Sequence, residues 1–341
     1  MQGNLKKINM LNQSLKLNTK IFNEDVEKIS TRTGFGEGLL KAGTDNENVI
    51  ALCADLTEST RTDLFSERFP ERFIQVGVAE QNLAATASGI AAMGKIPFIA
   101  SYAIFNPGRN WEQIRTTICY NNQSVKIIGS HAGISVGPDG GSHQALEDIA
   151  LTRVIPNMVV ISPCDAIEAK KATIACALTK DPTYIRLARN NTPIITTEET
   201  PFEIGKAQIF FTPEIGLAQV GIIATGPILY RAIIAAHELE KKGIKVKVMN
   251  LSTIKPLDTE TIISLAKEAK AIVTAEDHQI LGGMGSAVAE CLAQNYITPI
   301  EFVGINDKFG QSGIPEELEK HYKIDTQSII EKAEKVLKRK I

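Results

Sequence analysis

The feature that most constrains the fold is a regular alternation of short apolar runs and longer helical stretches, which begins near residue 48. Such runs, rich in Val and Ile, are typical of strands buried on both faces of a parallel sheet, with crossover helices between them. In the first half of the chain they are NVIALCAD (48–55), FIQVGV (73–78), IPFIASY (96–102), SVKIIGS (124–130), NMVVISP (157–163) and TYIRLA (183–188). The pattern predicts an α/β fold built on a doubly wound parallel sheet.

A second alternating block follows residues 193–206, where prolines and threonines interrupt the rhythm. Its apolar runs are QVGIIATG (219–226), KVKVMNL (245–251), AIVTAED (271–277) and IEFVGIND (300–307). We therefore predict two doubly wound domains, a parallel-sheet domain over 23–192 and a smaller, mostly parallel domain over 207–341, joined by a linker. The polar residues 1–22 are expected to form a flexible extension.

Composition argues against several classes of function. The formal net charge is −2, with 37 basic and 39 acidic residues, so the chain has no basic excess for nucleic acid. No apolar run approaches the roughly eighteen residues that suggest a membrane span. The five cysteines are scattered and include no CxxC pair. This usage indicates reduced thiols in a cytoplasmic protein rather than a zinc site or a disulfide framework.

Polar and aromatic side chains follow the ends of the predicted strands in the first domain. In an open parallel sheet, ligands bind outside the carboxyl ends of the strands. Along the chain, the candidates are Asp55 and Ser59, Glu80, Tyr102 and Phe105, then His131, Asp139 and His143 in a long Gly-rich loop, and finally Arg189. Any one of these is commonly a solvated loop residue, but their convergence on one rim predicts a functional site.

Two glycine-rich stretches, TGFGEG (33–38) and LGGMGSAVAE (281–290), are similar to nucleotide-binding loops. The second follows a strand and precedes a helix, but the acidic residue expected about twenty positions later lacks its strand context. We interpret both stretches as tight turns that allow close packing of helix on sheet.

Residues 31–190 resemble the pyrimidine-binding domain of transketolase-like thiamine diphosphate enzymes. The most specific motif is GVAEQN (77–82) with the Ala- and Gly-rich helix after it. SHAGISVGPDGGSHQALEDIA (130–150), STRTGFGEGL (30–39) and ADLTEST (54–60) support it. The second block resembles the C-terminal domain of the same family, so the resemblance covers nearly the whole chain after residue 25.

The resemblance implies a cofactor site at the strand ends. Glu80 matches the family's glutamate that hydrogen-bonds the aminopyrimidine ring of thiamine diphosphate and activates the cofactor. Tyr102 and Phe105 match apolar walls around that ring, and Asp55 and Leu56 match other positions that contact the cofactor.

The resemblance also implies a channel for sugar phosphates. Arg32 and Arg189 match phosphate-binding arginines, with Ser59 and His131 completing that group. Asp139 and His143 match residues that bind sugar hydroxyls, and His143 joins Glu80 as a predicted catalytic residue. Arg186 is a second candidate for the phosphate, but strand alternation places it and Arg189 on different faces, and the motif favours Arg189.

One half of the family's site is missing from this sequence. The diphosphate requires Mg²⁺ (or Ca²⁺), held in the family by a GDG motif with a downstream Asn, and no GDG motif is present. The chain therefore resembles the C-terminal subunit of a split transketolase, with a separate N-terminal subunit supplying the metal and diphosphate pocket. The small residues of the helix after Glu80 would allow that subunit to approach closely. Family geometry implies two copies of each chain, an α2β2 assembly.

Alternatives remain open at this stage. A 1-deoxyxylulose-5-phosphate synthase has a similar AEQ helix, but it is normally one long chain and tends to carry Arg where His131 stands. The β subunit of a 2-oxo acid dehydrogenase is also a split subunit but lacks the His131 and His143 pair. A non-catalytic assembly or regulatory subunit would need neither Glu80 nor the phosphate-binding residues. The donor and acceptor sugars are left open: xylulose 5-phosphate with ribose 5-phosphate, or sulfo-sugars.

Overall fold

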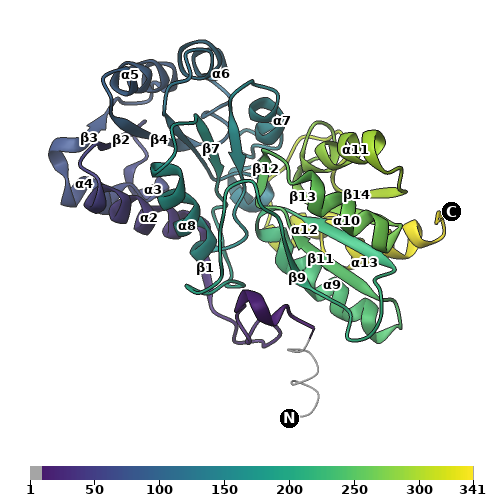
Figure 1. Ribbon diagram of the computed structural model, residues 1–341. Coiled ribbons are helices and arrows are strands. Elements are labelled where there is room, and N and C mark those ends of the chain that lie inside the picture. The colour runs from purple at the N-terminus through teal and green to yellow at the C-terminus, as the bar shows by residue number, and fades with distance from the viewer. Residues whose placement is uncertain (1–9, 341) are drawn as a thin grey trace.

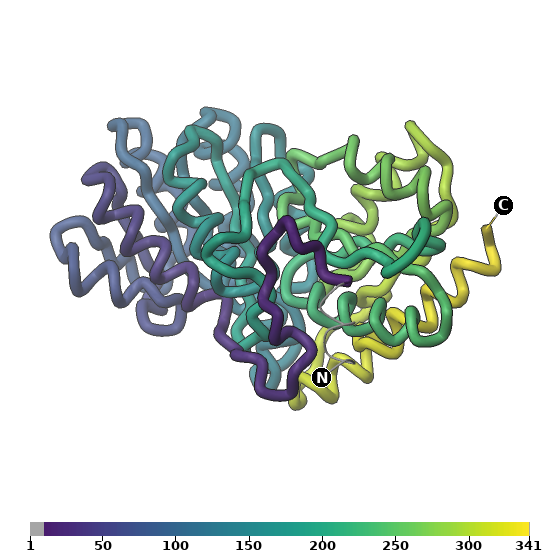
Figure 2. Tube along the Cα trace, turned by 60° about the horizontal axis from the view of Figure 1, so that its bottom comes forward, coloured from purple at the N-terminus to yellow at the C-terminus, as the bar shows by residue number. Residues whose placement is uncertain are grey.

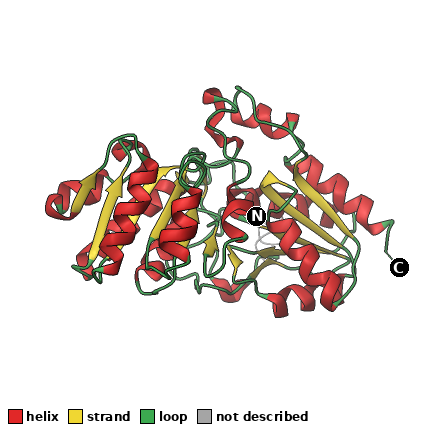
Figure 3. Cartoon of the chain, turned by 90° about the horizontal axis from the view of Figure 1, so that it is seen from above, coloured by secondary structure: helices red, strands yellow, loops and turns green. Residues whose placement is uncertain are grey.

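The apolar runs of both blocks become buried strands because helices cover both faces of each sheet (Figures 1 and 3). The computed structural model describes residues 10–340, and its two α/β domains lie side by side. The predicted fold class, with a larger parallel-sheet domain and a smaller, mostly parallel one, is confirmed. No helix within the described range is long and apolar enough to cross a membrane.

The first domain contains a seven-stranded sheet in the order β12-β6-β7-β5-β4-β2-β3, parallel except at β12. Its strands are β2 (Val49–Cys53), β3 (Phe73–Gln75), β4 (Ile96–Tyr102), β5 (Lys126–Ser130), β6 (Val159–Ile161), β7 (Thr183–Arg186) and β12 (Thr253–Lys255). The edge strand β12 comes from the second block and pairs antiparallel with β6. The predicted linker therefore does not separate the two sheets completely.

Two groups of helices cover this sheet, one on each face. Helices α2, α4 and α8 share one apolar cluster, and α5, η3 and α7 belong to another. The helices of this domain are α2 (Thr31–Asp45), α3 (Thr57–Thr60), α4 (Asp63–Arg68), η2 (Pro70–Arg72), α5 (Glu80–Ala92), α6 (Trp111–Gln113), the π-helix η3 (Ile114–Cys119), η4 (Ile134–Asp139), α7 (Asp148–Arg153) and α8 (Ala166–Ala177).

The second domain contains a five-stranded sheet in the order β14-β13-β10-β11-β9, in which only β9 is antiparallel. Its strands are β9 (Gln208–Phe211), β10 (Val220–Ala224), β11 (Val246–Asn250), β13 (Ile272–Gln279) and β14 (Ile300–Ile305). Its helices are η5 (Gly226–Ile228), α9 (Leu229–Lys241), α10 (Thr259–Ala269), α11 (Met284–Asn295), α12 (Pro315–His321) and α13 (Thr326–Leu337). Helices α9 and α13 pack on one face, while α10 and α11 join a cluster shared with the first domain.

Residues 10–22 are packed against the molecule, which corrects the expectation of a flexible extension over this part. Met10, Leu11, Leu17 and Ile21 are buried in the apolar cluster of the second domain, and Leu15 and Phe22 pack against it partly buried. These apolar residues recur within the polar stretch and hold it on the surface of the domain. The segment includes η1 (Gln13–Leu15) and crosses the junction between the domains (Figure 2). The chain then enters β1 (Lys28–Ser30), which pairs with β8 (Asn191–Pro193). Residues 1–9 lie outside the described range.

The stretch TGFGEG lies inside helix α2, so the prediction of a tight turn there is wrong. Its glycines serve a different purpose, since they let α2 approach α8 closely. A Cβ atom at Gly34 would overlap the backbone carbonyl of Ala166, and one at Gly38 would crowd the carbonyl oxygen of Lys170. By contrast, Gly282 before α11 has a φ of 74°, as a turn requires.

We expect Gly34→Ala to lower the free energy of unfolding by about 1–3 kcal/mol, because the added methyl group forces two helices apart. Gly89→Ala in α5 is the matched control, since an added Cβ meets nothing within 4 Å. A better helix former at that exposed position should be neutral or stabilising by about 0.5–1 kcal/mol. Urea unfolding of the isolated chain measures both. Equal stability of the two variants would contradict the assigned packing.

Candidate functional site

The predicted site forms where the carboxyl ends of adjacent parallel strands meet. The sheet contains β7, β5, β4 and β2 side by side in this order. The chain forms β3 on one side of β2 and then returns to form β4 on the other side, so its progress across the sheet reverses there. Such a reversal opens a crevice at the strand ends. Two residues that follow these strands, Asp55 and His131, have left-handed backbones with φ of 59° and 57°. Strained residues of this kind concentrate at functional sites.

Two aromatic rings and two imidazoles form a cluster at this crevice. The Tyr102 ring stacks on His131, with centroids 3.9 Å apart and planes inclined by 22°. The Phe105 ring meets His143 edge-on at 5.6 Å and lies nearly parallel to Tyr102 at 6.3 Å. Both rings are only half-buried, so they offer apolar surface to a flat ligand.

Arginines gather beside this cluster. Arg32 Nη1 donates to the backbone oxygen of Ser59 at 2.7 Å and lies 3.5 Å from His131 Nε2. Arg189 Nη1 donates to the Val136 carbonyl at 2.7 Å. Burial, followed by the charges of Arg61 and Arg189, lowers the pKa of Arg32. Arg32 is therefore close enough to Arg61 and to Arg189 for its positive charge to be repelled by both.

This positive charge is not balanced by protein carboxylates. Between residues 10 and 340, no ion pair joins Arg32, Arg61 or Arg189 to an acidic side chain, and Arg32 Nε and Arg61 Nε are buried without an acceptor. A buried donor without a partner is costly, so an anion that accepted these hydrogen bonds would stabilise the site.

His131 is held as a neutral ring. Its Nδ1 lies 2.9 Å from Ser130 Oγ. Burial, together with the nearby charges of Arg32 and Arg189, lowers the pKa of His131 to about 3. Near neutral pH this side chain therefore acts as a hydrogen-bonding group and not as a cation.

We expect the His131 ring to show no titration between pH 5 and 8 in NMR spectra, with its resonance assigned by His131→Asn. Because the folded-state pKa lies below the unfolded value of about 6.5, protons bind the unfolded chain preferentially between the two values. The stability contributed by neutral His131 is therefore complete above about pH 6.5 and is lost as the pH falls toward 3. An inflection of the His131 resonance near pH 6.5 would contradict this environment.

Glu80 is the first residue of helix α5, and its side chain is only 3% exposed. Ser101 Oγ donates to Glu80 Oε1 at 3.2 Å, and Asn110 Nδ2 donates to the Glu80 backbone oxygen at 3.0 Å. Ser101 directly precedes Tyr102 at the end of β4, so the Glu80 carboxyl group is anchored at the carboxyl end of the strand that carries Tyr102. The helix start carries no side-chain cap, which leaves its positive dipole end facing this carboxyl.

Three predicted residues lie apart from the cluster. Asp55 is exposed, and its backbone N–H donates to Gln75 Oε1 at 2.7 Å. Leu56 is half-buried at the start of α3, and Asp139 is exposed at the tip of the Gly-rich loop. No hydrogen bond or ion pair in the described range joins any of the three to the arginine or imidazole groups.

Arg186, the alternative phosphate ligand, is part of the buried scaffold. Its Nε donates to Asp148 Oδ2 at 2.8 Å, and Tyr184 donates to the same oxygen at 2.7 Å. Arg186 Nη2 donates to the backbone oxygen of Asp277 at 2.7 Å, which links the first sheet to the second domain. Arg186 is therefore committed to the contact between domains.

The second domain supports the Gly-rich loop directly. Asp277 Oδ1 accepts from the backbone N–H of Ile134 at 3.1 Å, and Gln144 Nε2 donates to the Gln311 oxygen at 3.0 Å. A Cβ at Gly133 would overlap the Asp277 carboxylate, so the loop must carry glycine there. The position of His131 and His143 thus depends on residues far away in the sequence.

Comparison with known proteins identifies the class of this chain. The family model described as transketolase, pyrimidine binding domain matches residues 27–194, and the transketolase, C-terminal domain model matches residues 217–329. A Methanocaldococcus jannaschii protein named as a transketolase C-terminal section is 45% identical over 311 residues, covering 90% of this chain and 96% of that protein. A 6-deoxy-6-sulfo-D-fructose transketolase subunit from Clostridium sp. (strain MSTE9) is 37% identical over 319 residues, covering 94% and 98%.

Structural comparison agrees. A solved structure described as a split gene transketolase, inactive beta4 tetramer, is 40% identical with a TM-score of 0.85, covering 92% of this chain and 100% of that chain. The chain therefore belongs to the transketolase family, a family of transferases. Within this family, it corresponds to the C-terminal subunit of a split transketolase, as the sequence analysis predicts.

Proposed function

We propose that the chain is the C-terminal subunit of a thiamine-diphosphate-dependent transketolase, which transfers a two-carbon ketol unit from a ketose phosphate to an aldose phosphate. The observation that carries this proposal is the group of uncompensated arginines beside a cluster of aromatic and imidazole rings at the strand ends. An anionic sugar and a flat heterocycle are the ligands that such a site would bind.

The residues at the crevice fit the aminopyrimidine part of the cofactor. Glu80 would accept or donate a hydrogen bond at a ring nitrogen, held in place by Ser101, while Tyr102 and Phe105 would line the ring. When bound, thiamine diphosphate supplies a carbon nucleophile that cleaves the bond next to a ketose carbonyl. Glu80 would hold the proton at the ring nitrogen in a site sheltered from water.

The substrate phosphate would bind Arg32, Arg189 and His131, with Arg61 adding positive charge. Neutral His131 would donate or accept a hydrogen bond, and Arg32 Nε offers a buried donor that lacks an acceptor. His143, edge-on to Phe105 beside the same crevice, would contact the sugar hydroxyls and take part in catalysis. Asp139 and Ser59 would complete the contacts to the substrate, and Asp55 and Leu56 the contacts to the cofactor.

An N-terminal subunit would supply the diphosphate and Mg²⁺ pocket, in a two-fold α2β2 assembly. The surface of α5 supports this, since Ala85, Gly89 and Ala92 are exposed and the flanking Val78 and Met93 are 79% and 83% exposed. Small residues beside exposed apolar ones suit close contact with another chain. The five cysteines, all buried and free, support a cytoplasmic setting.

The alternative substrate class with specific support is a sulfo-sugar. One relative is named for 6-deoxy-6-sulfo-D-fructose, and a sulfonate would accept hydrogen bonds from the same arginines. Activity with a sulfo-ketose and a phosphorylated ketose, compared side by side in the reconstituted complex, distinguishes the two. Ketol transfer to ribose 5-phosphate from neither donor would overturn the proposed reaction.

In that complex, we expect Arg32→Ala to raise the KM for a phosphorylated ketose about 10- to 100-fold, because a hydrogen bond to a charged group contributes about 1.5–3 kcal/mol. The same ketose without its phosphate should be used equally well by both forms. Arg68→Ala, at an exposed position on α4, is the matched control and should leave the KM for the ketose unchanged with and without its phosphate. A parallel loss with the unphosphorylated sugar would place Arg32 in the scaffold instead.

A further inference from the structure

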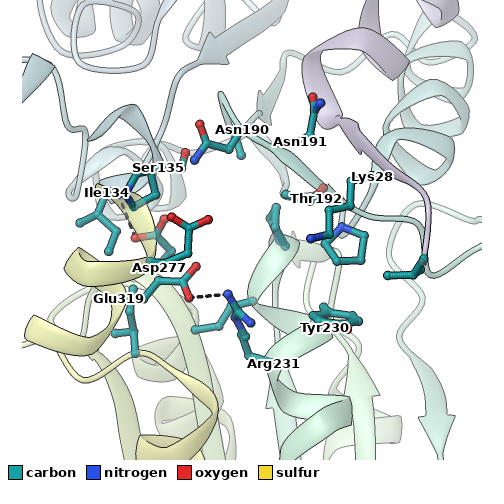
Figure 4. Close-up of a pocket in the computed structure, with 18 of the residues that line it drawn as sticks. Lys28, Ile134, Ser135, Asn190, Asn191, Thr192, Tyr230, Arg231, Asp277 and Glu319 are labelled. Atoms are coloured by element: carbon teal, nitrogen blue, oxygen red, sulfur yellow. Dashed lines mark hydrogen bonds and ion pairs between the residues drawn. The ribbon is translucent and has the colours of Figure 1, made fainter. Parts of the chain in front are cut away.

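We propose that a cavity between the two domains is a second ligand site, which binds a small zwitterion of the free amino acid class and is coupled to the Gly-rich loop. The cavity has a volume of about 240 Å³. Its walls come from the N-terminal segment, the first domain and the second domain (Figure 4). Arg32, Ser59, His131, His143 and Arg189 do not line it, so it is separate from the candidate active site.

One wall of the cavity is acidic. Asp277 and Glu319 lie on the same side in Figure 4, and Glu319 pairs with Arg231 at 2.8 Å. Asp277 Oδ1 accepts from the Ile134 N–H, but no ion pair in residues 10–340 involves the Asp277 carboxylate. Burial raises the pKa of both carboxyl groups, and the charge of Asp277 adds to the rise at Glu319. Arg186 and Arg231 offset part of this negative charge, and an ammonium group bound beside Asp277 would offset more of it.

The opposite wall offers a cation. Lys28 lies across the cavity from Asp277 in Figure 4, and no ion pair within the described residues engages it. Its backbone is fixed because Lys28 pairs with Pro193 in the β1–β8 ribbon. Asn190 and Thr192 add hydrogen-bonding groups along the rim, and the Tyr230 ring forms an apolar surface on the same side as Lys28.

These walls select a zwitterion. A simple cation would make no use of the exposed Lys28, and a simple anion would face Asp277 and Glu319. A molecule with both an ammonium and a carboxylate group satisfies the two sides at once. The volume is below the roughly 300–1,000 Å³ of sites for drug-sized ligands, so the cavity suits a small metabolite and excludes a nucleotide.

The cavity is physically connected to the active-site loop. Asp277 holds Ile134, the next residue, Ser135, lines the cavity, and Ser135 Oγ accepts from the Arg189 backbone N–H at 3.3 Å. Arg189 Nη1 in turn bonds the Val136 carbonyl. A ligand bound to Asp277 would therefore bias the position of one phosphate-binding arginine through two hydrogen bonds.

The test is calorimetric titration of the full chain with the twenty proteinogenic amino acids, each at up to 10 mM, followed by the N-acetyl and primary amide derivatives of any that bind. We expect at least one amino acid to bind saturably. Its N-acetyl derivative, which lacks the ammonium group, and its amide, which lacks the carboxylate, should each bind at least 10-fold more weakly. Hydrogen exchange at the amides of Ile134 and Arg189 should slow on binding.

Variants assign the binding to this cavity. Lys28→Ala, at an exposed position, and Asp277→Asn, which keeps an acceptor for the Ile134 N–H, should each weaken binding at least 10-fold. Lys41→Ala, on the exposed surface of α2, is the matched control and should bind like the parent chain. Absence of binding by any amino acid in the parent chain, or affinity unchanged in both Lys28→Ala and Asp277→Asn, overturns the proposal. None of these measurements depends on transketolase activity, so they test this proposal independently of the proposed function.

Discussion

The purified chain alone is expected to show no ketol transfer from xylulose 5-phosphate to ribose 5-phosphate, even with thiamine diphosphate and Mg²⁺ added. The physical reason is that, in the proposed function, Glu80 and the arginine group would hold only the pyrimidine ring and the substrate phosphate. The sequence lacks the GDG motif that would hold the metal and diphosphate. Addition of the N-terminal subunit from the same source should raise the rate from background to at least a thousand-fold above it, within the range of catalytic enhancements.

The control for this experiment is a demonstration that the isolated chain is folded. Circular dichroism and the unfolding transition should show a folded protein before the partner is added, so that inactivity reflects an incomplete site. Substantial turnover by the chain without its partner would contradict the half-site interpretation. Inactivity after reconstitution, across both phosphorylated and sulfonated ketoses, would contradict the proposed reaction instead.

The second large effect concerns Glu80→Gln in the reconstituted complex. We expect kcat to fall by about 10²–10⁴-fold, the usual contribution of a general acid or base, with little change in the KM for the ketose phosphate. The Gln side chain keeps an oxygen that can accept from Ser101, so the fold around α5 should be preserved.

Ser101→Ala is the matched variant for this prediction. It removes the hydrogen bond to Glu80 Oε1 but leaves the carboxyl group, so its effect on kcat should be far smaller than that of Glu80→Gln. Activity of the Gln variant within a few-fold of the parent would exclude the assigned role. Equal losses in both variants would show that anchoring of the side chain, and not its proton chemistry, is what matters.

Local patterns were enough to predict the strands and the rim where polar groups gather. Tyr102 ends β4, and His131 and His143 lie after the adjacent strand β5, so their clustering could be anticipated from chain order and the geometry of parallel sheets. The proposal that Arg32 binds the substrate phosphate depends on family resemblance, since its position in the first turn of a helix carries no signal. Arg61 was missed, although it lies only two positions after Ser59 in the same segment.

Long-range contacts explain the remaining misses. Asp277 supports the Gly-rich loop from another domain, and the Arg186 and Asp148 pair forms only when the sheet is complete. Neither contact leaves a periodic or local trace in the sequence. The glycines of TGFGEG suggest a turn because glycine is common both in turns and at close helix contacts, and only the partner helix distinguishes these uses.

The strand β12 has a consequence for how genes of this kind can be divided. Thr253–Lys255 belongs to the second block but completes the edge of the first sheet beside β6. A protein cut within residues 193–206 would leave β6 with an unpaired backbone edge, which invites aggregation. Separating the two domains onto different polypeptides therefore carries a structural cost that one continuous chain avoids.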